Sequence, residues 1–162
     1  MLLLRYLALI ALVLWIGGLL ALGGIAFPAA FSVTAARHVA DGQVLAGALV
    51  GEMLRRFEPV SWGAGGVLLL TLLIRAILGP RPRRFAWRAA LATVMLAVSV
   101  YAGLVVDARI ERLGAAIGVA VSSLPLNDAR RIEFNRLHGL ATDLQVVPLL
   151  GGLALIYWEL KE

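Results

Sequence analysis

Four apolar stretches dominate the sequence, and each is long enough to cross a bilayer as a helix of about twenty residues. The apolar fraction is 61% and the mean hydropathy is +0.90, whereas soluble domains average about 45 to 50% apolar residues. We therefore predict an all-α integral membrane protein, folded as one up-down four-helix transmembrane bundle. The predicted spans cover about residues 5–28, 60–79, 85–107 and 138–159.

The connections and helix ends follow from prolines, glycines and polar caps. The first span should be retained rather than removed as a signal peptide, because its apolar run is longer than a signal core. It should end near Pro28, since the residue before a proline disfavours helical geometry. An outer amphipathic helix is predicted over about residues 43–57, with Pro59 kinking or restarting it. The third helix should continue past its span to about Val121, and Asn127 or Asp128 should cap the last helix.

Arginines around one connection predict the orientation. All charged residues around the connection between the second and third spans are basic, whereas the two connections at the opposite end contain both basic and acidic residues. Under the positive-inside rule this connection and both termini lie in the cytoplasm, in an inner (plasma) membrane. Nucleic-acid binding is not expected, because these charges form a topology signal rather than an open patch. The arginines are Arg75, Arg81, Arg83, Arg84 and Arg88.

Residues 135–145 carry polar side chains into the last apolar run. On a helix, Asn135, His138, Thr142 and Gln145 share one face, and Arg136 and Asp143 lie on a neighbouring stripe. Polar and ionisable groups within a bilayer face other helices or water, so this face is predicted to point inward. The predicted ligand-binding residues are His138, Arg136, Asp143, Asn135, Thr142, Gln145, Glu52, Arg55, Arg56, Asp107 and Arg109. The competing interpretation is an ion-pair network that closes the outer mouth of the bundle.

Metal and haem binding remain open as alternatives. The chain has no cysteine, so metal ligands would have to come from His38, His138, Met53 and carboxylates. No HxxxH, HxxE or methionine-rich repeat supports such a site. A haem would use the only histidine pair, His38 and His138. We expect no cofactor, with haem or copper as the possible exceptions.

Two pairs of glycines, Gly47 with Gly51 and Gly114 with Gly118, have the spacing at which helices approach closely. They are interpreted first as packing within the chain. The alternative is a homo-oligomer contact through either pair.

Four short motifs stand out along the chain: Trp15-Ile-Gly-Gly18, Phe27-Pro-Ala-Ala-Phe31, the run from Ala46-Gly47 to Gly51, and Phe134-Asn-Arg-Leu-His-Gly139. Together they resemble the transmembrane-protein-205-like family of small four-helix membrane proteins. The Trp-Ile-Gly-Gly motif is more distantly similar to copper-resistance D proteins and four-helix protoporphyrinogen oxidases, which implies metal or haem handling. The resemblance extends to nine residues, and for most of them the implied role is structural. These residues are Trp15, Gly17, Gly18, Pro28, Phe31, Gly47, Gly51, Arg136 and His138.

The sequence thus predicts a non-enzymatic membrane protein that binds or helps to move a small charged or amphipathic ligand, such as an ion, a metal or a lipid headgroup. His138, Arg136 and Asp143 would form the inner part of the site in the outer half of the bundle. The first alternative is a haem- or metal-dependent oxidoreductase. The second is a structural or assembly partner of another membrane protein.

Overall fold

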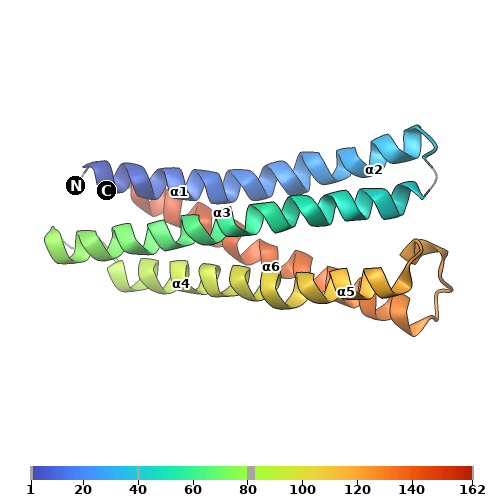
Figure 1. Cartoon of the computed structure of the whole chain (residues 1–162). Coiled ribbons are helices and arrows are strands. Elements are labelled where there is room, and N and C mark those ends of the chain that lie inside the picture. The colour runs from blue at the N-terminus through green and yellow to red at the C-terminus, as the bar shows by residue number, and fades with distance from the viewer. Residues whose placement is uncertain (1, 40, 80–82, 162) are drawn as a thin grey trace.

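The computed structural model describes residues 2–39, 41–79 and 83–161, and no strand occurs within these ranges. The predicted all-α four-helix bundle is confirmed (Figure 1). Four helical stretches are long and apolar enough to span a membrane, as expected for a multi-pass membrane protein. The elements are α1 (Leu2–Ala21), η1 (Leu22–Ala26), α2 (Phe27–Ala36), α3 (Gly42–Leu78), α4 (Phe85–Tyr101), η2 (Ala102–Asp107), α5 (Ala108–Ile117), η3 (Val121–Ser123) and α6 (Ala129–Leu160).

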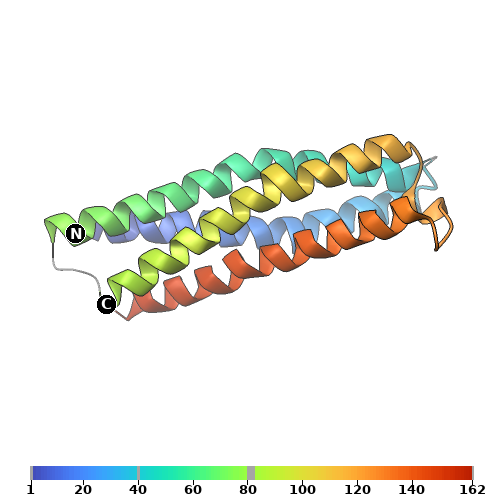
Figure 2. The same cartoon turned by 90° about the horizontal axis from the view of Figure 1, so that it is seen from below.

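Both termini lie at one end of the bundle, together with the end of α3 and the start of α4, and we call this the termini end (Figures 1 and 2). The opposite end, with the α2–α3 and α5–α6 connections, is the loop end. Residues 80–82 of the arginine-rich connection lie outside the described residues.

The bundle changes its packing along its length. Toward the termini end, α1 and α4 each pack against both α3 and α6, which closes a ring of four helices. Toward the loop end the helices pair into two arms, α2 with α3 and α5 with α6, which stand apart in Figure 1. At the tip, the Ser122 hydroxyl donates a hydrogen bond to the Gln43 side-chain oxygen and links the arms.

The expected end of the first helix near Pro28 is wrong, because the helix continues to Ala36. The π-helical segment Leu22–Ala26 ends two residues before Pro28. A proline lacks the N–H that an α-helix uses and collides with the carbonyl four residues earlier. The wider π-helical turn changes the backbone hydrogen-bonding pattern at that point, so the helix accommodates the proline and continues.

Pro59 likewise does not separate two helices. The predicted outer helix over residues 43–57 and the second span form one helix, α3, with Pro59 inside it. Phe57 is anchored next to the proline, since a β-carbon on Gly18 would lie 2.1 Å from its ring. The contact with α1 therefore stabilises the turn of α3 in which Pro59 cannot donate a backbone hydrogen bond.

Local signals at the α5–α6 connection match the structure more closely. The third helix ends at Ile117 rather than Val121, and Gly118 follows with a φ of 68°, the left-handed geometry that glycine adopts at helix ends. Asp128 caps α6 as predicted, accepting a hydrogen bond of 2.8 Å from the Arg130 backbone N–H. The last helix then continues to Leu160 with Pro148 buried inside it.

An ion-pair cluster fastens the termini end. The Glu159 side chain is 3% exposed, and its Oε1 accepts from Arg75 at 2.7 Å and Arg88 at 2.9 Å. Arg5 donates to the Glu159 carbonyl at 2.7 Å. Arg75 and Arg88 are therefore buried partners of α6. The orientation prediction had counted both among the charges of the connection between the second and third spans.

Candidate functional site: an acidic cavity between four helices

A small cavity lies where the ring of four helices opens into two arms. Its volume is about 40 Å³, and residues from all four helical rods line it. Apolar walls come from Leu19, Leu54, Phe57, Leu144 and Pro148, among others. The polar lining is Glu58, Ser61, Ser99, Asp107 and Gln145, with Trp15 beside them.

Glu58 reaches the cavity from α3 because its partner helix has no side chain at the contact. A β-carbon on Gly103 would lie 2.7 Å from the Glu58 carboxyl carbon and 2.8 Å from its Oε1. The carboxyl therefore rests directly on the backbone of η2, and any larger residue at position 103 would displace it.

Asp107 comes from the opposite arm and is the last residue of η2. Short π-helical segments are rare, and they occur frequently at functional sites. Here the segment also contains Gly103, so one local distortion supplies both the second carboxylate and the surface that receives the first.

The cavity lining includes hydrogen-bond donors and acceptors besides the carboxylates. Ser61 is buried, and its hydroxyl donates to the Glu58 backbone carbonyl at 2.8 Å. Trp15 is 1% exposed, and its indole Nε1–H is shielded from solvent without a hydrogen-bond acceptor among the described residues. Buried donors without acceptors are uncommon in folded proteins and call for an explanation.

Further charges surround the cavity on the loop side. Glu58 experiences like-charge repulsion from Asp107 and Glu111 and attraction from Arg55. Arg55 itself is held at the surface of α3, 2.5 Å from a Glu52 oxygen, and Arg56 pairs with the same carboxylate at 2.6 Å. Acidic groups from both arms therefore gather around one small space.

On its termini side the cavity meets a continuous apolar core. Leu12, Leu68, Leu72 and Met95 belong to this core and are at most 1% exposed. The large indole of Trp15 joins the same cluster, packed so closely that a β-carbon on Gly65 would lie 3.0 Å from its ring. In this conformation the side chains separate the cavity from the ion-pair cluster at Glu159.

The structure brings only part of the predicted ligand-binding set to this cavity. Asp107 and Gln145 line it, whereas Glu52, Arg55 and Arg56 form the ion pairs on the surface of α3. The remaining members of the set are exposed and away from the cavity lining: Asn135, Arg136, His138, Thr142, Asp143 and Arg109.

The expectation that the polar face of the last helix points inward is wrong for Asn135, His138 and Thr142. The inward face of α6 is instead built from apolar and small residues, among them Leu137, Ala141, Gly151 and Gly152. His138 lies about 33 Å along α6 from its termini end, beyond the roughly 30 Å of a hydrocarbon core. At that depth a polar side chain does not need an internal partner. Its ring stacks on Phe134 at a centroid distance of 6.3 Å.

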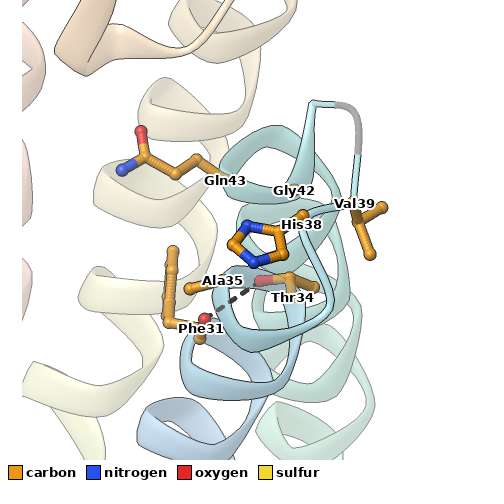
Figure 3. Close-up of a pocket in the computed structure, with 7 residues that line it drawn as sticks. All are labelled: Phe31, Thr34, Ala35, His38, Val39, Gly42 and Gln43. Carbon is orange, nitrogen blue, oxygen red and sulfur yellow. Dashed lines mark hydrogen bonds between the residues drawn. The ribbon is translucent and has the colours of Figure 1, made fainter.

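The two histidines belong to separate places. His38 lines an open hollow of about 370 Å³ at the tip of the α2–α3 arm, with Phe31, Thr34 and Gln43 (Figure 3). In Figure 3 the imidazole lies above Thr34, whose hydroxyl donates to the Phe31 carbonyl at 3.0 Å, and Val39 points away. Among the described residues, no three His, Asp or Glu side chains gather in a way that could hold a metal ion.

Sequence reasoning missed the central members of the cavity. The predicted ligand-binding set does not include Glu58, and Trp15 enters the prediction only through the Trp-Ile-Gly-Gly motif. The available signal was the i, i+4 spacing of Gly103 and Asp107, which places a glycine and a carboxylate on one stripe of a helix. That spacing alone does not reveal which carboxylate faces the glycine.

The fold defines a four-helix, multi-pass membrane protein with an acidic cavity between its helices. The chain belongs to the family described as a domain of unknown function (DUF4149), which matches residues 10–118. The matched region includes Trp15, Glu58, Gly103 and Asp107 and ends before α6. Searches of the curated proteins and of the solved structures gave no match.

Proposed function

We propose that this membrane protein binds a small inorganic cation, the proton included, in the cavity between Glu58 and Asp107. The observation that supports the proposal most directly is that two carboxylates from facing helices line one cavity to which all four membrane-spanning helices contribute. Ionisable side chains that face the interior of a membrane-protein bundle mark ion or proton sites.

The chemistry of the lining favours a cation held by oxygen. Carboxylate, hydroxyl and amide oxygens suit hard cations, and the lining offers all three in Glu58 with Asp107, Ser61 with Ser99, and Gln145. A cavity volume of about 40 Å³ is more than one water needs. Haem or a lipid headgroup is far larger than this space, so the site fits a small ion.

The position of the cavity favours access from the loop end. Glu58 lies about 30 Å and Asp107 about 33 Å along their helices from the termini end, at about 1.5 Å per residue. This places them near the loop-side boundary of a hydrocarbon core that is roughly 30 Å thick. With the termini cytoplasmic, as the arginine distribution predicts, the site would take its cation from the outer side.

Thermal unfolding of the purified protein tests the proposal. A ligand that binds only the folded state raises the unfolding temperature with its concentration. We expect lithium, sodium, potassium, magnesium, calcium or proton concentration to shift the unfolding temperature of the wild type. Glu58→Gln and Asp107→Asn should both lose that shift.

Glu52→Gln is the matched control, because Glu52 lies on the same helix but pairs with arginines at the surface. It should retain the cation response. An identical response in all four proteins, or no response to any cation or to pH, would contradict the proposal.

A further inference from the structure

The ring of four helices opens into two arms at the level where all four rods lose their regular helical geometry. We propose that this level is a hinge, about which the α2–α3 arm and the α5–α6 arm move together and apart, closing and opening the loop side of the cavity. Such a motion goes beyond the proposed function, because it does not depend on what the cavity binds.

The irregular points of the four rods adjoin the cavity. In α3, Pro59 follows the lining residue Glu58, and in α6 the lining residue Pro148 lies inside the helix. The π-helical segment η2 contributes lining residues, Asp107 among them, and η1 begins three residues after Leu19, which also lines the cavity. Helices bend at prolines and at π-helical turns, where the regular backbone hydrogen bonds are interrupted. The four rods are therefore easiest to bend at the cavity.

Each arm is packed as a body of its own. In the α5–α6 arm, the members of a small buried cluster, with Leu137 at its centre, all come from η2, α5 and α6. In the α2–α3 arm, Ala46 is fully buried, and a β-carbon on Gly42 would lie 3.2 Å from the Thr34 side chain. Close packing resists deformation, so we expect each arm to move as one unit.

The arms hold each other at the tip only weakly. Within the described residues, the bond from the Ser122 hydroxyl to the Gln43 side-chain oxygen is the one hydrogen bond that joins them, and the ion pairs of the loop end stay within an arm. Water competes for an exposed hydrogen bond, so this bond acts as a weak latch. The α3 helix continues about 24 Å beyond Glu58 toward the tip, at about 1.5 Å per residue, so a small bend at the cavity is amplified there.

Distances between pairs of spin labels, measured on the protein in lipid nanodiscs, test the hinge. The chain has no cysteine, so labels attach only to introduced cysteines. Val33→Cys in α2 with Ile132→Cys in α6 reports the distance between the arms, and Val33→Cys with Leu49→Cys reports a distance within one arm. All three side chains are exposed. We expect a shorter and a longer population between the arms, and a single population within the arm.

Ser122→Ala removes the latch. The longer between-arm population should rise about two- to tenfold relative to the shorter one, as expected for the loss of one hydrogen bond. Ser123→Ala is the matched control, because the Ser123 hydroxyl donates to the Ala120 carbonyl within the same connection. It should leave both populations unchanged.

Pro59→Ala tests the level of the bend. The substitution restores a backbone N–H in the middle of α3 and removes the steric conflict of the proline ring. The stiffer helix should narrow the between-arm distances to one population.

Three results would overturn the hinge. The first is a between-arm distribution that is the same in the wild type and in Ser122→Ala, and the second is one that Pro59→Ala leaves unchanged. The third is an equal broadening of the Val33–Leu49 distance, because the arm would then fray rather than move as a unit. None of these measurements uses a cation, so a cation response that is absent while the arms move would refute the proposed function alone.

Discussion

The carboxyl group of Glu58 rests on the backbone of Gly103, so that a β-carbon at position 103 would lie 2.7 Å from the carboxyl carbon. The contact joins the α3 rod to the π-helical segment that ends at Asp107. The contact fixes where the Glu58 carboxylate lies relative to Asp107, so the proposed site depends on how these two helices pack.

Gly103→Ala should impair the site while leaving the fold intact. The added methyl group meets the far end of a flexible side chain, so Glu58 can turn away at little cost, and the free energy of unfolding should change by less than about 1 kcal/mol. Proton or cation affinity should fall by about fivefold, which corresponds to about 1 kcal/mol. Titration of the unfolding temperature measures both quantities.

Gly63→Ala is the control for this substitution, because nothing lies within 4 Å of its β-carbon position. It should raise the free energy of unfolding by about 0.5 to 1 kcal/mol and leave the affinity unchanged. Equal affinities in the wild type and Gly103→Ala would show that the Glu58 position does not matter for binding.

The sequence was sufficient for the fold class because membrane spans are a problem of length and polarity. Runs of about twenty apolar residues have one common solution, and the four rods are found where these runs occur. The cap of α6 was predictable because its signal is local. Asp128 accepts a hydrogen bond from the backbone N–H of Arg130, two residues later in the chain. The predicted end at Pro28 was wrong because the rule that a helix ends before a proline assumes α-helical geometry. Here the segment before the proline is π-helical, and the helix continues.

The candidate site was less accessible to sequence reasoning. Placing His138 and Asn135 on one face was correct geometry, but periodicity does not decide which face of α6 approaches its neighbours. Packing decided it, because Gly151 and Gly152 allow Met95 and Ile16 to press against the α6 backbone, which turns the polar stripe outward. The pairing of Glu58 with Gly103 likewise joins two helices, and no spacing within one helix encodes such a contact.

Glu159→Gln should destabilise the protein strongly. The carboxylate is 3% exposed and is shared by Arg75 and Arg88, so its loss removes a buried charge that both guanidinium groups contact. Breaking a buried ion pair by removing one partner costs about 3 to 5 kcal/mol. We expect a loss of about 3 kcal/mol in the free energy of unfolding, measured by titration with a denaturing detergent. Glu133→Gln, an exposed position on the same helix, should have almost no effect.

Acid should weaken the start of α6 through Asp128. Hydrogen bonds from the Arg130 side chain and then from its backbone N–H lower the pKa of Asp128 to about 2. The unfolded value is about 3.9, so the stabilisation is complete above about pH 4 and is lost as the pH falls through about 2. Asp128→Asn keeps a capping oxygen but has no charge to lose. Its unfolding temperature should therefore fall less than that of the wild type between about pH 4 and pH 2, and parallel curves would contradict this assignment.

Gly152→Ala should reveal how closely α6 packs against α1. A β-carbon on Gly152 would lie 2.1 Å from Cδ1 and 2.7 Å from Cγ1 of Ile16, a residue that is 4% exposed. Overpacking of this kind costs about 1 to 3 kcal/mol. Ile16→Val removes Cδ1 and should cost about 0.5 to 1.5 kcal/mol alone. If the collision is the cause, the double variant should be more stable than the sum of the two single losses predicts, by at least about 0.5 kcal/mol. Additive losses in the denaturing-detergent titration would mean that the two helices separate rather than collide, so the α1–α6 contact would be looser than the structure shows.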